Sequence, residues 1–435
     1  MARFWTAQRT RAVGYGLLPG VLLCLPLVAA AHPVTPAARV PVGDTRAWAH
    51  AWPMVGHDPQ RTYRSASAGP LHPQLIFSSE TDFSNPLIGP DGSLYGWSYN
   101  ARTRVAGLTA LTATGSQRWT VPLSQTEGGP PTLTPQRLML ANGRDASGQA
   151  IIALTMDNGR RSWTVRSLPW TTGIHGVPNS KAFAPLVTAA GLLYMPFVGP
   201  DFNGQGDNQG LEVVSPSGAP LRVLQPGVSA NVAMARDGTV YELGGRCCTG
   251  PGSLTALTPK GVRRWTRTLG FAFGSALLAG MRGILYVSDS TGIGPGHPGE
   301  VGAYAPSSRR RWRLHTTDGE AVLAERADGT VLVATATSLS AVSPQGKRMW
   351  RRTLGRLTPA EAAAPTLPSL AVDVAGRVYV GSNDGMVRAI GSDGALLWTV
   401  SVGGPGPSSG SPSLALGPDG RLVVAGTDGH LRVYR

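Results

Sequence analysis

Hydrophobic and polar residues alternate in short runs along most of the chain, and each run ends at a small polar turn. One unit recurs as LTALTATGSQRW, IIALTMDNGRRSW, LTALTPKGVRRW, VGAYAPSSRRRW, LSAVSPQGKRMW and VRAIGSDGALLW. An alternating apolar run is followed by the turn and then by a Trp. Because side chains of a β-strand point to opposite faces in turn, this period of two predicts two strands joined by a hairpin.

The Trp of each unit stands four residues after the turn position, so its place in the unit is fixed. A seventh copy, LEVVSPSGAPLR, has Arg222 in its place. We expect these rings to have a structural role and to dock against the next unit, close to an Ala of the preceding strand, since burial of such a ring contributes about 2–3 kcal/mol. The residues are Trp119, Trp163, Trp265, Trp312, Trp350 and Trp398.

A second hairpin signal precedes each unit, as in LIGPDGSLYGW, VAMARDGTVYEL and LALGPDGRLVVAG. Asp-Gly between alternating apolar runs is a strong hairpin signal. Each repeat therefore supplies four short antiparallel strands. Four such strands in about 40 to 50 residues are typical of one blade of a β-propeller.

Seven copies are complete, whereas the last stretch, SPSLALGPDGRLVVAGTDGHLRVYR, supplies three strands before the chain ends. The missing outer strand is found in LHPQLIFSSET, residues 71–81, with Phe77 at the Trp position. We therefore predict an all-β fold, an eight-bladed β-propeller over residues 52–435. An N-terminal strand that pairs with the C-terminal blade would close the ring and remove a free edge.

The first 31 residues have the features of a secretory signal peptide, with arginines followed by a short apolar run and Ala29-Ala30-Ala31. Residues 32–51 are interpreted as a linker. No later segment is apolar enough to span a bilayer. We expect an exported monomer that is periplasmic, associated with the cell envelope or secreted, in an oxidising compartment.

The chain is basic, with 39 Lys and Arg against 25 Asp and Glu. Arginines cluster at the second turn and the outer strand of several repeats. They either protect exposed strand edges or attach the rim to an anionic envelope surface or partner. No nucleic acid is expected, because no aromatic residues are interleaved with them. The clusters are Arg160-Arg161, Arg263-Arg264, Arg309-Arg310-Arg311, Arg348 and Arg351-Arg352.

The repeat Ala-x-x-x-x-Gly-x-x-x-Trp closely resembles the tryptophan-docking motif of the pyrroloquinoline quinone (PQQ) repeat propellers. The opening WPMVGHDPQRTYRS, residues 52–65, is also similar to the first segment of many members. The resemblance covers nearly all of the chain after residue 51 and implies the propeller fold. It leaves function open, because the family includes PQQ-dependent alcohol dehydrogenases and non-catalytic scaffolds such as a lipoprotein of the outer-membrane barrel-assembly machinery.

Two adjacent cysteines, Cys247 and Cys248, lie in GGRCCTGPGS. This stretch joins the second and third strands of its blade, on the face where ligand sites of such propellers usually lie. The resemblance implies a vicinal disulfide over a quinone; a disulfide that only stiffens the loop, or two free thiols, are the alternatives. Candidate groups for a quinone site are Trp97 or Trp170 for stacking, Asp207 or Glu242 as a base and Arg246 near a carbonyl. None falls in a family motif, and we expect no PQQ to be bound.

The loop DFNGQGDNQGLE, residues 201–212, spaces oxygen ligands in the manner of a calcium loop. Its candidate ligands are Asp201, Asn203, Gln205, Asp207 and Glu212. A solvated polar loop is the alternative. Trp170 and His175 of SLPWTTGIHGVPNSKAF are further candidates for the same face.

Loops on this face are long in blades 1–5 and short in blades 6–8, where they read ATATSL, GSNDGM and AGTDGH. We therefore expect a protein or an envelope component to dock over blades 1–5. The predicted function is that of an exported binding or scaffold module without enzymatic activity. The alternative is a PQQ- and calcium-dependent alcohol dehydrogenase with Cys247–Cys248 over the quinone.

Overall fold

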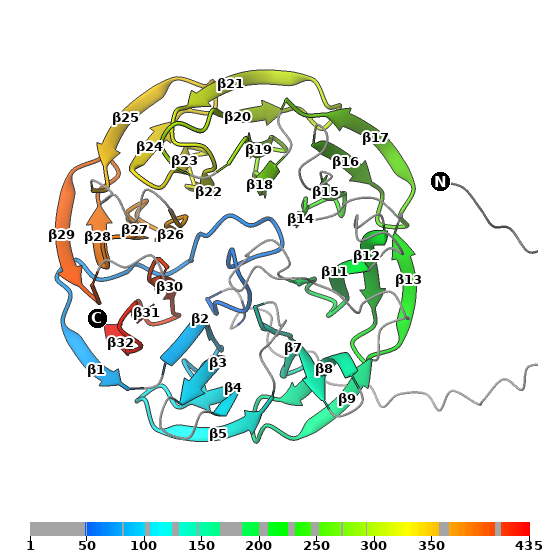
Figure 1. The fold of residues 1–435 in the computed structure, drawn as a ribbon, viewed down its shortest axis with the longest axis vertical. Helices are drawn as coiled ribbons and strands as arrows, with labels where there is room; N and C mark the ends of the chain where they lie inside the picture. Colours follow the sequence, from blue (N-terminus) through cyan, green and yellow to red (C-terminus); the bar gives the residue numbers. More distant parts are fainter. Residues whose placement is uncertain are drawn as a thin grey trace, which may run out of the picture. The chain divides into compact units, whose positions relative to one another are not determined.

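The computed structural model describes residues 48, 50–80, 82–100, 105–123, 130–145, 148–165, 185–199, 208–224, 231–244, 252–270, 273–292, 294–355, 365–404 and 410–435. Within these ranges the chain forms eight four-stranded antiparallel sheets. They follow one another in a ring, with one strand of each sheet innermost and one on the outer rim (Figure 1). The predicted eight-bladed propeller is confirmed.

Each blade is given from its innermost to its outermost strand. Blades 1 to 4 consist of β2 (Asp82–Ile88), β3 (Leu94–Asn100), β4 (Val105–Leu111), β5 (Gln117–Pro122); β6 (Thr132–Leu133), β7 (Leu138–Asp145), β8 (Gly148–Thr155), β9 (Arg161–Val165); β10 (Leu186–Val187), β11 (Leu193–Gly199), β12 (Asn208–Val214), β13 (Pro220–Leu224); β14 (Asn231–Met234), β15 (Val240–Gly244), β16 (Ser253–Leu257) and β17 (Arg263–Thr268). Blades 5 to 8 consist of β18 (Phe273–Ala279), β19 (Leu285–Ser290), β20 (Gly299–Tyr304), β21 (Arg310–Thr316); β22 (Val322–Glu325), β23 (Val331–Ala334), β24 (Ser338–Val342), β25 (Arg348–Thr353); β26 (Ser369–Val372), β27 (Val378–Gly381), β28 (Met386–Ile390), β29 (Leu396–Ser401); β30 (Ser413–Leu416), β31 (Leu422–Ala425), β32 (Leu431–Tyr434) and β1 (Leu75–Ser79).

The hydrophobic core lies between neighbouring blades. Leu108 and Ala110 of blade 1, for example, share a buried cluster with Leu133 and Met139 of blade 2. Neighbouring blades cover both faces of each sheet. The strands inside the rim are therefore continuous apolar runs, such as VLVA in β23, in which every residue is buried. The outer strands keep the alternating pattern, since one of their faces meets solvent.

Six tryptophans each dock their blade onto the next, as predicted. Trp312 lies opposite Ala303 in the ladder between β20 and β21, and its indole N–H donates to the carbonyl of Pro344 in the next blade at 2.9 Å. The other five donate in the same way: Trp119 to Met156, Trp163 to Pro216, Trp265 to Pro306, Trp350 to Ser392 and Trp398 to Pro70.

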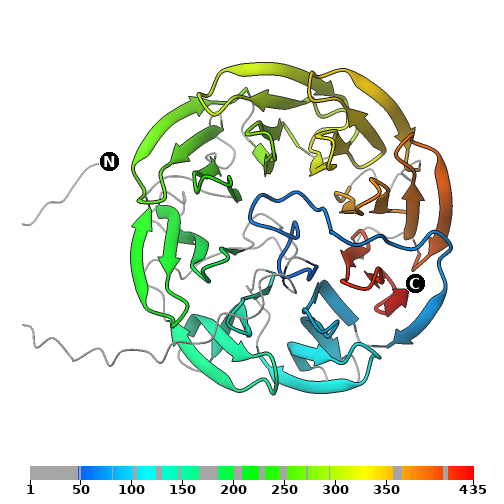
Figure 2. The same cartoon turned by 180° about the vertical axis from the view of Figure 1, so that it is seen from behind.

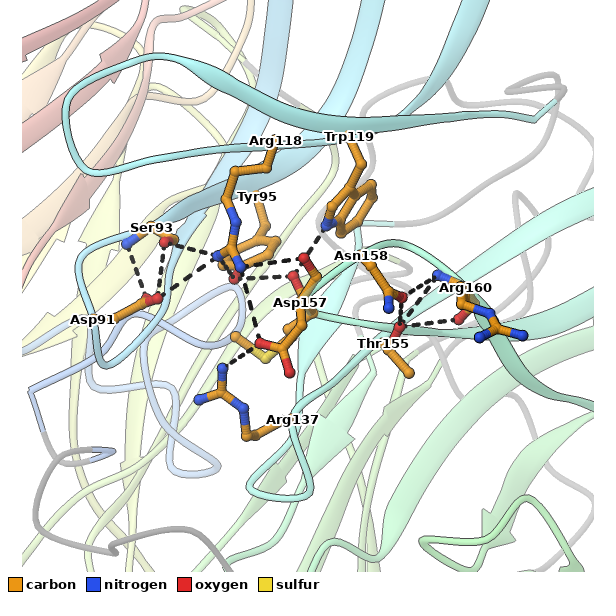
Figure 3. A network of polar contacts seen from close by, with 11 residues as sticks. Asp91, Ser93, Tyr95, Arg118, Trp119, Arg137, Thr155, Asp157, Asn158 and Arg160 are labelled. Carbon is orange, nitrogen blue, oxygen red and sulfur yellow. Dashed lines mark hydrogen bonds and ion pairs between the residues drawn. The ribbon is translucent and has the colours of Figure 1, made fainter.

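Further polar contacts lie beside the docked ring of Trp119, between blades 1 and 2 (Figure 3). Arg118 donates to the carbonyl of Asp157 at 3.2 Å, while Trp119 donates to Met156 at 3.0 Å. The carboxylate of Asp157 accepts from Arg137 at 2.5 Å. The turn between β8 and β9 is therefore held by β5 of blade 1 and by the turn between β6 and β7 of its own blade.

Two blades lack the Trp, and an arginine reaches the equivalent carbonyl in each. In blade 3, Arg222 donates to Pro259 of blade 4 at 2.7 Å. In blade 8, Phe77 packs below Gly115, and Arg421 donates to the carbonyl of Ala113 at 2.6 Å. The sequence pattern did not identify Arg421, because it lies outside the repeat motif.

The ring closes between strands from the two ends of the propeller. β1 pairs antiparallel with β32, with Phe77 opposite Val433. Beyond this ladder, Gln74 and Arg435 exchange two backbone hydrogen bonds of 2.9 Å. Figure 2 shows from behind that β1 completes the rim next to the C-terminus. The predicted closure is thus confirmed.

Candidate functional site

Residues 52–68, here called the hub segment, run across the inside of the ring (Figure 1, blue). Trp52 exchanges backbone hydrogen bonds with Ile88 at the end of β2. The carbonyls that follow accept from the inner strands of blades 2, 4, 5, 6 and 7. The donor–acceptor pairs are Leu133 to Pro53, Met234 to Pro59, Ala279 to Gln60, Glu325 to Thr62 and Val372 to Tyr63, all between 2.7 and 3.0 Å.

Side chains of the hub segment reach the two remaining blades. Arg61 donates to the carbonyl of Pro185 in blade 3 at 3.4 Å and to Val232 in blade 4 at 3.2 Å. Ser67 donates to Pro418 in blade 8 at 2.9 Å. The segment thus contacts all eight blades. Its backbone contacts with six of them are to the last residue of the first strand, on the face that carries the turns between first and second strands.

The hub segment is tightly wound. His57, Arg61 and Tyr63 all have left-handed φ angles between 55° and 71°, a region that residues other than Gly seldom adopt. Asp58 stabilises this course by accepting from the backbone N–H of Thr62 at 2.9 Å and from its hydroxyl. Burial opposes the charge of Asp58, but the contacts with His57 and Thr62 prevail and lower the pKa of this carboxyl.

A small cavity remains between the hub segment and the inner strands of blades 1, 7 and 8. Its volume is about 20 Å³, and Trp52, Tyr63, Asn85, Leu370 and Leu414 are among the residues that line it. A site of this size has room for about one water molecule. The described part of the hub is therefore packed, and the opposite face of the ring is the candidate for binding.

On that opposite face, the middle hairpins of the blades differ in height. The second and third strands have seven or eight residues each in blades 1, 2 and 3, but four or five in blades 6, 7 and 8. The second strand begins two residues after the glycine of the first turn in every blade except blade 2, where it follows Arg137, a residue of similar left-handed φ. The extra residues therefore extend toward the opposite face. At a rise of about 3.3 Å per residue, three or four residues add roughly 10–13 Å.

Two apolar side chains next to the turn of the blade 1 hairpin are exposed. Tyr99 near the end of β3 and Val105 at the start of β4 are 39% and 38% exposed. Tyr99 lies opposite Ala106 at the far end of the ladder. We call the extended hairpins of blades 1–3 the raised crescent.

Most residues that were singled out on this face lie outside the part of the chain that the structure describes. They remain predictions, and the possible vicinal disulfide and most of the calcium loop are among them. These residues are Trp170, His175, Asp201, Asn203, Gln205, Asp207, Arg246, Cys247 and Cys248.

Trp97 was a candidate for the ligand face, but it lies in the core. It is 2% exposed and packs in the cluster between blades 1 and 2. Its place in β3 opposite Leu108 explains this, because both side chains point to blade 2. Trp97 therefore offers no free ring for stacking.

Glu212, the last candidate calcium ligand, lies in the middle of β12. It is buried, opposite Met195 on β11 and Val223 on β13, and burial raises the pKa of its carboxyl. This position does not fit a ligand at the mouth of a surface loop. Among the described residues, no group of three or more His, Cys, Asp or Glu side chains could hold a metal ion.

Glu242 is a buried carboxyl in blade 4 with a large pKa shift. It lies on β15, opposite Val232, which packs in the cluster between blades 3 and 4, and its Oε1 is buried without a hydrogen-bond partner. Burial raises its pKa to about 8. This carboxyl is therefore mostly protonated at neutral pH and is a poor general base there.

Glu320, between β21 and β22, was not identified from the sequence. Burial raises its pKa to about 7. No motif marks this residue, since its environment arises from the packing of two distant loops: its N–H donates to the carbonyl of Gly292 at 2.9 Å.

Within the described ranges, no helix combines the length and the apolar character that crossing a membrane requires.

Comparison with known proteins places these observations in a family. The family model described as outer membrane protein assembly factor BamB matches residues 79–199 and 297–435, which is more than half of the chain. No match was found among curated proteins.

Solved structures share the fold. BamB from Moraxella catarrhalis is similar with a TM-score of 0.53 at 17% identity, covering 83% of this chain and 99% of that protein. Quinohemoprotein alcohol dehydrogenase from Comamonas testosteroni is similar with a TM-score of 0.59 at 12% identity, covering 88% of this chain and 80% of that protein. At these identities the likeness concerns the fold alone. With its repeat motif, its eight docked blades and the match of the family model, this chain belongs to the PQQ-repeat propeller family described as outer membrane protein assembly factor BamB.

Proposed function

We propose that this protein is an exported binding or scaffold module, not an enzyme, and that a protein or envelope component docks on the raised crescent. The observation that carries the proposal is the difference between the two faces. The hub segment is bonded to every blade on one face, whereas the hairpins of blades 1–3 extend from the other. The family description, an assembly factor, supports a role in binding.

The contacts of the hub segment also support the proposal, because they make the propeller a rigid platform. Backbone hydrogen bonds from six inner strands end on one segment, so the blades are cross-linked at the axis as well as through their tryptophans. A preorganised surface binds with less loss of conformational entropy. The exposed Tyr99, near the end of β3 in the crescent, is the type of residue that is enriched at the centres of interfaces.

The test is photo-crosslinking in cells. Benzoylphenylalanine replaces Tyr99 on the crescent or, as the matched control, Val374, which is also exposed but lies in the turn between β26 and β27 on the hub side. We expect one or a few discrete adducts from position 99 and none of the same mass from position 374. Identical adducts from both positions, or none from position 99, would contradict a docking surface on the crescent.

The dehydrogenase alternative is tested separately by titration of the non-reduced protein with PQQ and calcium, followed by tryptophan fluorescence. We expect no saturable quenching up to tens of micromolar quinone, a range in which specific cofactor binding would be evident (roughly 6–8 kcal/mol of binding free energy). Saturable binding that is lost in a Cys247→Ser/Cys248→Ser variant would replace the scaffold proposal with the enzyme.

A further inference from the structure

The outer rim of the ring differs in charge from blade to blade. Residues 258–268, 305–316 and 343–353, which form the last turn and outer strand of blades 4, 5 and 6, each contain four Lys or Arg and no Asp or Glu. The equivalent residues of blades 7 and 8, 391–401 and 71–81, contain no Lys or Arg. We call the rim of blades 4–6 the basic sector; its strands β17, β21 and β25 are consecutive in Figure 1.

Two of these twelve side chains have structural roles. Arg267 points inward, 5.1 Å from the ring centre of Tyr304, and donates to the carbonyl of Ser308 in the next blade at 3.1 Å. Arg352 donates to the carbonyl of Gly394 at 2.8 Å. The other ten are exposed: Lys260, Arg263, Arg264, Arg309, Arg310, Arg311, Arg313, Lys347, Arg348 and Arg351.

Few carboxylates oppose these ten charges. Within the described part of the chain, Glu300 lies 3.3 Å from Arg310 and 3.7 Å from Arg313, and two longer pairs join Arg264 to Asp237 and Arg351 to Asp318 at 3.8 and 3.7 Å. Three carboxylates are thus shared among ten cations. A large positive excess remains toward solvent.

Protection of strand edges does not explain where these charges lie. The outer strands of blades 7 and 8 are edges of the same kind, but they present Leu396, Leu397 and Ile76, all exposed by more than 40%. An edge-protecting charge would be expected there as much as on blades 4–6. The basic sector therefore needs a different reason.

We propose that the basic sector binds an anionic polysaccharide. Any group of cations on such a rim would attract anions, but ten of the twelve here are arginines. The planar fork of an arginine matches carboxylate and sulfate groups with two parallel hydrogen bonds. The charges follow a convex arc over three blades. A flexible chain can follow this arc, whereas a flat bilayer touches a convex rim over a narrow strip.

Other partners fit this surface less well. Proteins that bind single-stranded nucleic acid stack bases on exposed aromatic rings, but Trp265, Trp312 and Trp350 are committed to the next blade through their N–H groups. A protein interface would require an apolar centre depleted in charge. Within the basic sector the large exposed apolar side chains are Val262 and Met349, which belong to different blades.

The test measures binding of the purified protein to fluorescently labelled heparin and polygalacturonate by anisotropy. The variant Arg263→Gln/Arg311→Gln/Arg348→Gln removes one exposed charge per blade, none of which is ion-paired in the described residues. The control, Arg160→Gln/Arg236→Gln/Arg282→Gln, removes three exposed arginines from other parts of the molecule, so both variants have the same net charge. We expect about tenfold weaker binding for the rim variant and less than about twofold for the control.

The salt dependence gives a second readout, because displaced counterions set the slope of log K against log salt concentration. This slope should become shallower by roughly 2–3 in the rim variant. Equal losses in both variants would overturn the assignment to the basic sector. Equally tight binding of single-stranded DNA or of phosphatidylglycerol vesicles would overturn the polysaccharide, as would undiminished binding to neutral dextran.

Discussion

At the scale of single residues, the contact of Trp312 with the next blade depends on the absence of a side chain at Gly346. A Cβ at this glycine would lie 2.6 Å from Cγ of Trp312, and its φ is 89°. Gly346→Ala should therefore lose stability through both the backbone and the ring contact. Gly296 isolates the first effect, since its φ is 88° and no atom lies within 4 Å of an added Cβ.

We expect Gly296→Ala to lower the free energy of unfolding by about 1–2 kcal/mol and Gly346→Ala to lower it by a further 1–3 kcal/mol or so. Urea unfolding followed by tryptophan fluorescence measures both. Equal losses in the two variants would show that the docked ring does not restrict this position.

A second prediction at this scale concerns Glu242 and pH. Its pKa is raised to about 8 in the folded chain against about 4.3 in an unfolded one. The folded state thus holds a proton that the unfolded state releases. This stabilisation is complete below pH 4, decreases as pH rises, and is lost above pH 8.

Glu242→Gln keeps the shape and removes the titration, so it should match the native protein near pH 4 and exceed its stability at pH 8.5 by at least about 1 kcal/mol, given about 1.4 kcal/mol per pKa unit. Urea unfolding across this range measures the difference. Glu80→Gln, at an exposed position, removes a carboxylate of the same type and serves as the matched control. A Glu242→Gln profile parallel to that of the native protein would disprove the buried titration.

At the scale of elements, the hub segment has only isolated bridges at Trp52 and Arg64, but it contacts all eight blades. Asp58 holds it through Thr62, the residue whose carbonyl accepts from Glu325 of blade 6. Asp58→Ala should therefore weaken the hydrogen bonds between the hub segment and several blades together. We expect a loss of about 2–3 kcal/mol and faster amide hydrogen exchange at Met234, Ala279, Glu325 and Val372.

Asp58→Asn is the matched control, because its amide oxygen can still accept from the N–H of Thr62. It should retain most of the protection. Faster exchange confined to the hub segment in Asp58→Ala would mean that the inner strands do not depend on it.

The strands and the docking of the tryptophans were predictable because they depend on local spacing. An alternating run, a Gly turn and a Trp four residues later specify β24, β25 and Trp350 without reference to the rest of the chain. The course of residues 52–68 could not be predicted, since its partners are backbone groups from eight blades. Backbone groups leave no pattern in a sequence. The core position of Trp97 was missed for a related reason: both faces of a blade are buried, so alternation does not reveal which side chains reach a surface.

At the scale of the whole molecule, closure depends on four residues at the C-terminal end. A variant that ends at Gly429 lacks β32, so β1 loses its partner and blade 8 keeps two strands. We expect loss of the cooperative unfolding transition and the appearance of oligomers, since two strand edges become free.

Removal of Arg435 alone serves as the control: it deletes two backbone hydrogen bonds with Gln74 but leaves β32 in place. Thermal unfolding and size-exclusion chromatography distinguish the two variants. A monomeric, cooperatively unfolding chain that ends at Gly429 would show that the ring does not need this closure.

The hub segment also has a consequence for the order of events during synthesis. Residues 52–68 leave the ribosome before any of the blades that they contact, and one of their last acceptors, Pro418, is made more than 350 residues later. Contacts of such long range form late in folding. The segment therefore cannot complete its contacts until translation is nearly finished. A prematurely terminated chain would expose part of it, which gives quality-control proteases a direct means to tell an unfinished molecule from a finished one.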